Sequence, residues 1–304
     1  MKNKLSISVI LLTYNEQLHI ERCLGSLLPI VQAVYLVDSG STDRTVELAE
    51  SMGATVLHHP WKNYADQFQW GLDNAPIDTD WVMRMDADEY LESELQNEIR
   101  SRLPVLPCEV SGVYLKRKVM FMGRWVRHGG FYPHILLRIW RTGLGRIEQR
   151  WMDEHIILDG DGKTIQFEYD LVDDNRKGIT FWIDKHNSYA SREMVDLLNR
   201  RFDLLPRDDA IKIQDDPQAR WKRILKDEVY VKLPLGLRAS IYFTYRYFFR
   251  LGFLDGVSGF IFHFMQGFWY RLLVDAKVME VLEKSNGDAE KIRQIIHDEY
   301  GLKL

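Results

Sequence analysis

The sequence contains little cysteine and little net charge. Its two cysteines, Cys23 and Cys108, lie far apart in a chain of 304 residues. They indicate neither a disulfide framework nor a thiolate metal cluster, and a reducing cytoplasm is the simplest setting for them. The net charge of −4 argues against a general nucleic-acid binder. Any site for a polyanion must therefore be local.

Signatures of nucleotide-binding loops and of membrane spans are also missing. No Gly-x-Gly-x-x-Gly or Walker-type sequence occurs, so a dinucleotide-binding or P-loop protein has no support. The run 256–270 lacks Asp, Glu, Lys and Arg, but it is shorter than the roughly 20 residues that a membrane-spanning helix needs. The apolar N-terminus continues into Tyr14-Asn15-Glu16 without a small-residue cleavage site, and we interpret it as a buried strand rather than a signal peptide.

What is present has the composition of a globular protein, with 46% hydrophobic and 28% charged residues. Short β-branched apolar runs alternate with segments of helical character. The strand-like runs are 7–12, 33–38, 54–59 and 81–86, and the helix-like segments between them are 16–28, 41–53 and 64–75. This alternation predicts an α/β fold with a mainly parallel sheet. Ser41 or Thr42 is the expected N-cap of the second helix, and Gly53 is its expected C-cap.

The second half of the chain has a different pattern. Strand-like pieces extend the sheet, a helix is expected at 178–202, a loop at 206–218, and aromatic-rich helices at 219–282; the strand-like pieces are 109–121, 134–141 and 163–172. We therefore expect an α/β domain over 1–205 and a helical, basic and aromatic region over 206–304.

Polar residues follow three of the predicted strands. They are Thr13 to Glu16, Asp38 to Gly40, and Asp86 to Glu89. In open α/β sheets, ligands bind at the carboxyl ends of the strands, so this edge is the candidate site.

Asp86-Ala87-Asp88 ends an interior strand, and strand alternation places Arg84, Asp86 and Asp88 on one side. Such carboxylates can hold Mg²⁺ or Mn²⁺ while phosphate oxygens complete the coordination. The alternative is a solvated strand end that binds nothing. A diphosphate with its metal is the interpretation favoured by the neighbouring polar groups.

Asp38 suits a hydrogen bond to a nucleobase N–H or a ribose hydroxyl. The alternative is a cap for the helix that follows. At the end of the first strand, backbone and side-chain groups are available to the same nucleotide, from Thr13, Tyr14, Asn15 and Glu16.

Five segments together resemble the inverting GT-A glycosyltransferases of family 2, especially the bacterial enzymes that build lipopolysaccharide core and capsular glycans. The segments are "SVILLTYNE", "VDSGSTDRT", "WVMRMDADEYL", "GGFYPHILLRIWR" and "RWMDEH". The resemblance implies a nucleotide-sugar donor, with a UDP-sugar as the first expectation, a divalent cation (Mn²⁺ or Mg²⁺) and inversion at the anomeric carbon. By motif, Asp38 would bind the base, Asp86 the ribose or diphosphate, and Asp88 the metal.

One position departs from the family pattern. Many relatives carry an Arg-Asn pair in the third helix, where this chain has Phe68-Gln69. Gln67 matches the pattern and is a candidate donor contact. Phe68 cannot supply the usual cation, and Arg84 is the candidate replacement.

The resemblance also points to a general base in "RWMDEH". An inverting transfer needs a group that takes the proton of the acceptor hydroxyl. The family pattern resembles an acidic pair whose second member is the base, which favours Glu154 over Asp153. His155 is a candidate for orienting the base or contacting the metal. The alternative is a surface acidic pair.

Arginines and aromatics in the second half suggest the acceptor side. Trp125 and Tyr132 suit stacking on sugar rings, His186 is a further acceptor-side candidate, and six arginines suit an acidic or phosphorylated acceptor, namely Arg124, Arg127, Arg138, Arg141, Arg146 and Arg150. Between Arg220 and Arg250, eight Lys or Arg residues stand against two acids and are interleaved with aromatics. This pattern fits a helix lying on an anionic membrane. A packed core or a homodimer interface is the alternative.

The sequence therefore predicts a cytoplasmic enzyme, peripheral on the inner face of the membrane, that glycosylates a glycan or glycolipid. One rival is a haloacid-dehalogenase-type phosphatase with Asp86 as nucleophile and 171–175 as its later acidic segment, but Tyr90 stands where that motif expects Thr or Val. A sugar-binding protein without catalysis is the other rival.

Overall fold

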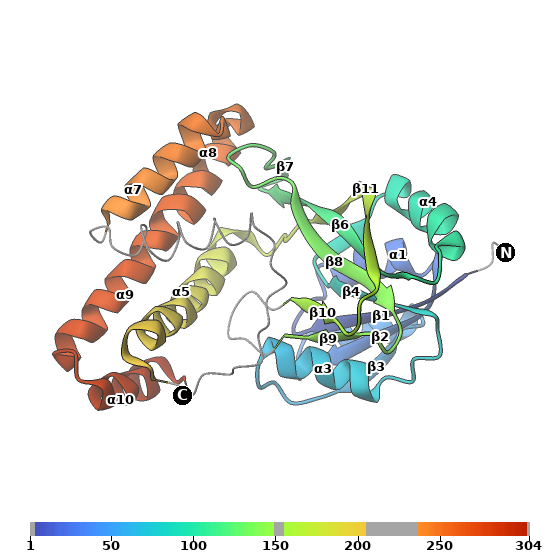
Figure 1. Ribbon diagram of the computed structural model, residues 1–304, viewed down its shortest axis with the longest axis horizontal. Helices are drawn as coiled ribbons and strands as arrows, with labels where there is room; N and C mark the ends of the chain where they lie inside the picture. Colours follow the sequence, from blue (N-terminus) through green and yellow to red (C-terminus); the bar gives the residue numbers. More distant parts are fainter. Residues whose placement is uncertain (1–3, 149–154, 205–235, 303–304) are drawn as a thin grey trace. The chain divides into compact units, whose positions relative to one another are not determined.

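The computed structural model describes residues 4–148, 155–204 and 236–302 (Figure 1). Contacts divide the chain into two compact units at Gly178. Helix α5, Gly178–Phe202, therefore groups with the C-terminal helices, whereas we had expected it within an α/β domain over 1–205. The expected loop at 206–218 lies outside the described residues.

The first unit is built on a nine-stranded sheet with the order β3-β2-β1-β4-β8-β6-β11-β5, to which β7 adds by pairing with β6. The first four strands are β1 (Leu5–Thr13), β2 (Val31–Asp38), β3 (Thr55–His58) and β4 (Trp81–Asp86), and they pair in parallel. The others are β5 (Glu89–Leu91), β6 (Val110–Phe121), β7 (Arg124–Trp125), β8 (His134–Arg141) and β11 (Lys163–Asp173). A separate hairpin joins β9 (Gly145–Ile147) to β10 (Ile156–Leu158).

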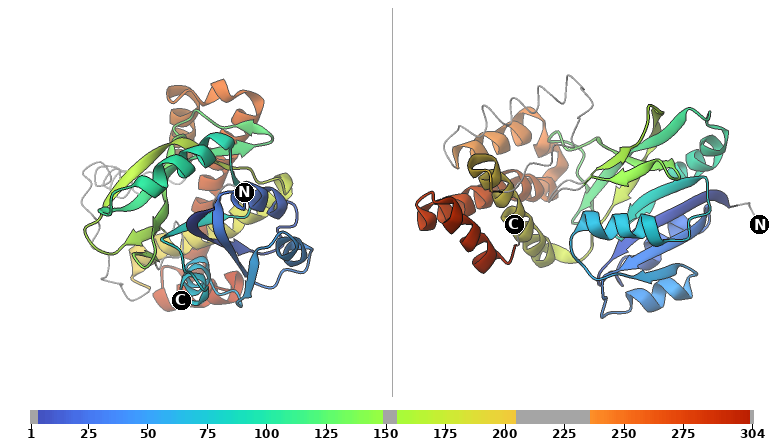
Figure 2. Two further views of the ribbon diagram at one scale, coloured as in Figure 1. Left: turned by 90° about the vertical axis from the view of Figure 1, so that its right-hand side faces the viewer. Right: turned by 60° about the horizontal axis from the view of Figure 1, so that its bottom comes forward.

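Helices cover both faces of this sheet (Figure 2). One face packs on α1 (Ile20–Leu27), α2 (Thr45–Ser51) and α4 (Ser93–Arg102), the last followed by the short helix η1 (Leu103–Val105). The other face packs on α3 (Tyr64–Asn74), with Phe68 against Ile10 and Trp140. Because both faces are covered, the central strands are apolar throughout, which is why they read as continuous hydrophobic runs.

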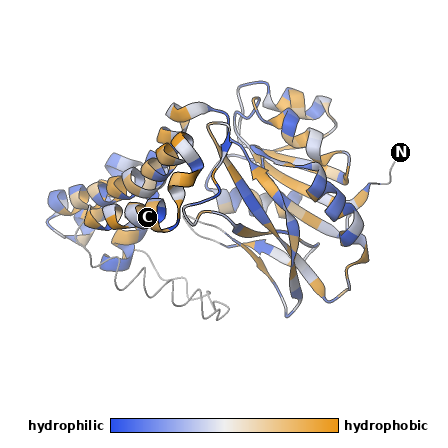
Figure 3. Ribbon diagram, turned by 90° about the horizontal axis from the view of Figure 1, so that it is seen from above, coloured by the Kyte–Doolittle hydropathy of each residue, from blue (hydrophilic) through white to orange (hydrophobic). Residues whose placement is uncertain are grey.

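The second unit is helical. Its elements after α5 are α7 (Leu237–Thr244), η3 (Tyr245–Phe249), η4 (Gly252–Asp255), α8 (Gly256–Phe264), η5 (Met265–Trp269), α9 (Tyr270–Ser285) and α10 (Ala289–Tyr300). Met194 and Leu198 of α5 pack on Val281 of α9 and Ile292 of α10. Figure 3 shows the distribution of hydrophobic residues along these helices and along the strands of the sheet.

Within the described ranges, no single helix is long and apolar enough to cross a membrane. One bent pair, Leu237–Phe249 with Gly252–Ser285, has the length and hydropathy of a membrane-spanning helix only when its two arms are counted together. The arms make an angle of 71°.

The predicted α/β fold class, a sheet flanked by helices with a helical C-terminal region, is confirmed. Two helix starts are later than predicted, at Ile20 and Thr45, because the preceding residues form hydrogen-bonded loops. Ser41 is not an N-cap, since its hydroxyl bonds Asp38 and the Asn15 N–H. Gly53, with φ of 91°, follows α2 in the left-handed conformation expected of a helix C-terminus.

Candidate functional site

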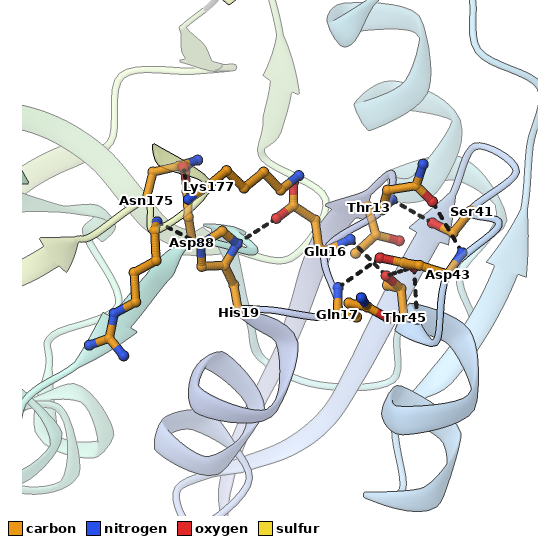
Figure 4. Close-up of polar contacts among 12 residues, drawn as sticks. Thr13, Glu16, Gln17, His19, Ser41, Asp43, Thr45, Asp88, Asn175 and Lys177 are labelled. Carbon is orange, nitrogen blue, oxygen red and sulfur yellow. Dashed lines mark hydrogen bonds and ion pairs between the residues drawn. The ribbon is translucent and has the colours of Figure 1, made fainter. Parts of the chain in front are cut away.

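The parallel register brings three predicted site residues to the same end of neighbouring strands. Thr13 pairs with Asp38 across β1 and β2, and Leu12 pairs with Asp86 across β1 and β4. The loops that follow these strands lie at one edge of the sheet, where Figure 4 shows their polar contacts. The predicted clustering of Thr13 to Glu16, Asp38 and Asp86 is thus present.

The Asp38 carboxylate is buried and has internal hydrogen-bond partners on both oxygens. Oδ1 accepts from Thr13 Oγ1 (3.0 Å) and Ser41 Oγ (2.5 Å), and Oδ2 accepts from the N–H groups of Gly40 and Ser41 (2.9 Å each). A carboxylate has about four acceptor positions, so these donors fill it. This geometry resembles the alternative role for Asp38, a cap for the segment that follows, because Asp38 holds together the turn after β2. To bind a nucleobase, the Asp38 carboxylate would have to give up one of these internal hydrogen bonds.

Asn15 closes the loop after β1. Its φ of 53° is left-handed, a conformation that Asn tolerates better than most residues. Its side-chain oxygen accepts from the backbone N–H groups of Thr42 (2.8 Å) and Asp43 (3.3 Å). Tyr14 is 57% exposed beside it. Of the predicted contacts in this loop, Tyr14 is therefore the side chain that faces solvent.

Glu16 ties this loop to the segment after β11. Its two oxygens contact Lys177 Nζ and His19 Nδ1, both at 2.7 Å (Figure 4). His19 is fully buried, and its Nε2 accepts the backbone N–H of Arg176 at 2.8 Å. Because Nε2 accepts, the ring proton lies on Nδ1 and is donated to Glu16. Glu16 therefore acts here as a link within the unit.

Asp86 is held by side chains on the α3 side of β4. Tyr64 donates its hydroxyl to Asp86 Oδ1 at 2.7 Å, and Arg84 Nε donates to the same hydroxyl oxygen at 3.1 Å. The Arg84 guanidinium also lies over the rings of Tyr64 (4.6 Å) and Phe68 (5.6 Å). The Arg84 cation thus lies beside Phe68 of α3, and its role as the replacement for a donor-binding cation stays a prediction.

Strand alternation accounts for Arg84 and Asp86 but not for Asp88. The strand ends at Asp86, and residues 87–88 form a turn before β5. Glu89 is the first residue of β5 and is buried.

Arg138 is the main site residue whose role the sequence did not reveal. Between β6 and β8, Val113 pairs with Ile139 and Tyr114 with Leu137, so Arg138 is the extra residue of a β-bulge. The bulge aims its Nη2 at Glu89 Oε1 (2.6 Å) and Asp86 Oδ2 (3.5 Å).

The surroundings shift the pKa values of Asp86 and Glu89 in opposite directions. Burial acts to raise the pKa of Asp86, but Arg138, Arg84 and the Tyr64 hydroxyl outweigh it and hold that pKa well below its usual range. Burial raises the pKa of Glu89 to about 8, although Arg138 acts in the opposite direction. Asp86 therefore keeps its negative charge at neutral pH.

Replacing Arg138 by Met is expected to lower the free energy of unfolding by about 3–5 kcal/mol, because it leaves the buried Glu89 and the half-buried Asp86 without this cation. The matched control is Arg146→Met, which removes an exposed pair with Asp159 and should cost no more than about 1 kcal/mol. Denaturant unfolding of both variants checks this. Equal losses would show that Arg138 does not stabilise the acids.

Asp88 differs from the other acids in its partners. Its Oδ2 accepts from Asn175 Nδ2 at 2.9 Å, and its backbone carbonyl accepts from Arg22 Nη2 (3.2 Å) and the Asp174 N–H (3.1 Å). Among the described residues, Asn175 provides the one hydrogen bond to its half-buried carboxylate. Asp88 therefore retains acceptor capacity at the edge of the sheet.

The other predicted donor and metal contacts have partners of their own or lie outside the described ranges. Gln67 is buried, and its amide bonds both the ring and the carbonyl of His59 (2.9 and 3.1 Å). His155 Nδ1 lies 3.5 Å from Glu148 Oε2. Within the parts of the chain that the structure describes, no three His, Cys, Asp or Glu side chains converge on one point. The predicted bases Asp153 and Glu154 lie outside those parts.

The described acceptor-side candidates each have partners within the protein. Tyr132 donates to Asp170 and packs edge-on against Trp125, while Arg141 lies over the Trp81 ring at 4.1 Å. Arg127 lies over the Trp125 ring, Arg146 pairs with Asp159, Arg124 is exposed in β7, and Arg150 is outside the described residues.

Two histidines have depressed pKa values. Burial lowers the pKa of His186 to about 4, and the ring stacks on Trp182 inside the second unit. Burial and the cations Arg117 and Arg138 lower the pKa of His134 to about 4. Neutral His134 therefore accepts a hydrogen bond on Nδ1 from Arg117 Nη2 (2.9 Å), a pair that sequence spacing did not suggest.

The chain resembles known glycosyltransferases. An uncharacterized glycosyltransferase of Rickettsia bellii is 44% identical over 93 residues, which are 31% of this chain and 31% of that protein. The match thus spans about a third of that relative. The lipopolysaccharide core biosynthesis glycosyltransferase LpsC of Rhizobium meliloti is 28% identical over 200 residues, 62% of this chain and 70% of LpsC.

Two solved structures are also similar. Glucosyl-3-phosphoglycerate synthase from Mycobacterium tuberculosis, solved with Mn²⁺, UDP and glucosyl-3-phosphoglycerate, is 25% identical over 38% of this chain and 44% of that chain, with a TM-score of 0.31. TarS from S. aureus is 16% identical over 97% of this chain and 92% of that chain, with a TM-score of 0.44. The family model described as glycosyl transferase family 2 matches residues 8–159, half of the sequence. The chain therefore belongs to glycosyl transferase family 2.

Proposed function

We propose that the chain is an inverting, metal-dependent glycosyltransferase that moves a sugar from a nucleotide-sugar, first a UDP-sugar, to a hydroxyl of a lipid-linked or lipopolysaccharide-type glycan. Family membership supports the reaction class, and the name of LpsC supports the acceptor class. The two cysteines suit a cytoplasmic enzyme at the inner face of the membrane.

The observation that carries this proposal is the contrast between Asp88 and its neighbours. Asp38 is filled by internal donors, and Asp86 is held by Tyr64 and Arg138. Asp88 lies at the same edge of the sheet with one hydrogen bond to its carboxylate from the described residues. A half-buried acid with spare acceptor capacity, close in sequence to a second acid that is charged at neutral pH, suits a cation site.

These residues fit a divalent metal. Mg²⁺ and Mn²⁺ prefer oxygen ligands, and Mg²⁺ is commonly bound by one or two carboxylates together with substrate phosphates. Asp88 would hold the ion, with Asp86 next to it, and the diphosphate would supply the remaining oxygens. When bound, such an ion neutralises negative charge on the departing nucleoside diphosphate.

The protein's own groups would carry the proton and orient the donor. The acceptor hydroxyl oxygen forms a bond to the sugar C1 as the bond from C1 to the diphosphate oxygen breaks. Glu154 takes the hydroxyl proton, as the family resemblance implies, and Arg84 supplies a positive charge near the diphosphate. The attack from the opposite face gives inversion without a covalent enzyme intermediate.

A phosphatase with Asp86 as nucleophile is not supported. The family match assigns the chain to glycosyltransferases, and Asp174 of the later acidic segment is paired with Arg22 and Arg176.

A donor screen tests the proposal. UDP-, GDP- and dTDP-sugars are each added to the full chain with and without Mn²⁺, and the melting temperature is measured. We expect one nucleotide class to raise it by several degrees in the presence of Mn²⁺, because ligands that bind only the folded state stabilise it. A protein that is neither stabilised by nor able to hydrolyse any of these donors would contradict the proposal and leave a non-catalytic sugar-binding protein.

A further inference from the structure

Exposed apolar side chains in the second unit concentrate around one turn. The turn, residues 248–257, joins η3 to α8 and contains η4. Phe249 and Val257 are each 76% exposed, and four further large apolar side chains of the turn are exposed as well, namely Phe248, Leu251, Phe253 and Leu254. We call these six residues the apolar tip. Soluble proteins rarely leave so dense an apolar patch uncovered.

We call the turn and the helical segments on either side of it, residues 237–264, the hairpin. Some polar side chains of the hairpin are buried. Asp255 and His263 are buried, with Oδ2 and Nε2 at 3.2 Å, and buried Arg246 reaches His263 Nδ1 at 3.2 Å. The hairpin therefore buries a polar network beside aromatic pairs such as Phe243 with Phe260, while the apolar tip stays exposed. Apolar surroundings would remove the free-energy cost of exposing the apolar tip to water. They would leave the buried hydrogen-bond network undisturbed.

The charge on the outside of the hairpin is positive. From residue 237 to 264 the sequence has a single acid, Asp255, and that acid is buried against His263. Arg250, in the centre of the turn, is exposed. Within residues 237–264, the exposed surface thus carries the cation Arg250 and no carboxylate, which complements an anionic surface.

The backbone of the turn has a defined conformation. Leu251 has a left-handed φ of 60°, and the Arg250 N–H donates to the carbonyl oxygen of Tyr245 at 2.9 Å. A Cβ on Gly252 would lie 2.7 Å from the His263 ring, so glycine permits the turn to approach α8 closely. The apolar tip is therefore presented on an ordered backbone.

We propose that the apolar tip inserts into the interfacial layer of an anionic lipid bilayer. Exposed apolar residues occupy neighbouring positions such as 248, 249 and 251, so they leave the turn in several directions. A bilayer can cover all of them at once, whereas a flat protein face covers one side. Insertion to about 5–10 Å is typical of interfacial elements.

Vesicle flotation of the full chain tests this proposal at low salt. The vesicles contain phosphatidylcholine alone or phosphatidylcholine with phosphatidylglycerol. We expect the wild-type protein to float with the anionic vesicles and Val257→Asp to lower the bound fraction about tenfold, because a carboxylate is costly in apolar surroundings. The matched control is Val105→Asp, since Val105 lies in the first unit and is also 76% exposed. It should float like the wild-type protein.

Several results would overturn the proposal. They are a wild-type protein that does not float with anionic vesicles, a Val257→Asp variant that floats as well as Val105→Asp, and a Val257→Asp variant that loses only self-association in sedimentation. The last would assign the apolar tip to contact with a second copy. Phe249→Asp repeats the test at another exposed position, and thermal unfolding shows that the variants fold. No donor is needed, so the result is independent of the proposed transfer activity.

Discussion

Replacing Asp88 by Asn should lower sugar transfer by about 10²- to 10³-fold, the range typical when one electrostatic contact to developing charge is removed. The side chains have the same shape, and Asn can still accept the hydrogen bond from Asn175 through its amide oxygen. The variant should therefore fold normally. What it loses is the negative charge that would hold the divalent cation.

The measurements for Asp88→Asn are the transfer rate and the Mn²⁺-dependent rise in melting temperature with donor. Both should fall together. Asp80→Asn is the matched control, because Asp80 belongs to another Asp-x-Asp sequence and is exposed. An Asp88→Asn variant that keeps its Mn²⁺-dependent donor binding would remove Asp88 from the metal site.

Replacing Glu154 by Gln should lower transfer by about 10²- to 10⁴-fold, the usual contribution of a general base. Donor binding should remain, because the base acts on the acceptor hydroxyl. The amide of Gln cannot take up the proton. Transfer and donor-dependent melting temperature are measured on the same preparation, so loss of chemistry is separated from loss of binding.

The comparison for Glu154→Gln is Asp153→Asn, which changes the neighbouring acid in the same way. We expect Asp153→Asn to retain most of the transfer activity. The opposite pattern, with Asp153→Asn inactive and Glu154→Gln active, would exchange their roles. Loss of donor binding in Glu154→Gln would instead place Glu154 at the donor.

Much of the sheet edge could be predicted because its causes are local. Each of the three parallel strands ends where an apolar run meets polar residues, and parallel strands carry their carboxyl ends to one edge. This reasoning places Thr13, Asp38 and Asp86 together without any coordinates, and the register confirms it. The sequence pattern of the second half also predicts the helix at 178–202, whose bounds match α5.

The electrostatics of the site could not be predicted in the same way. Arg138 reaches Asp86 and Glu89 because a β-bulge aims it there, and a bulge depends on how two strands pair. In the sequence Arg138 is one of six arginines with no feature that marks it. Asp38 and Asp88 likewise both follow apolar runs, yet one carboxylate is filled and the other is not.

By itself, the sequence determined the α/β class, the acidic edge of the sheet and the resemblance to family 2 glycosyltransferases, because periodicity and motifs act over short distances along the chain. Only the tertiary structure decided which acid retains acceptor capacity and which apolar side chains remain exposed. Asn175, 87 residues from Asp88, and the buried pair of Asp255 and His263 show why. Hydrogen-bond partners and burial are set by segments that folding brings together.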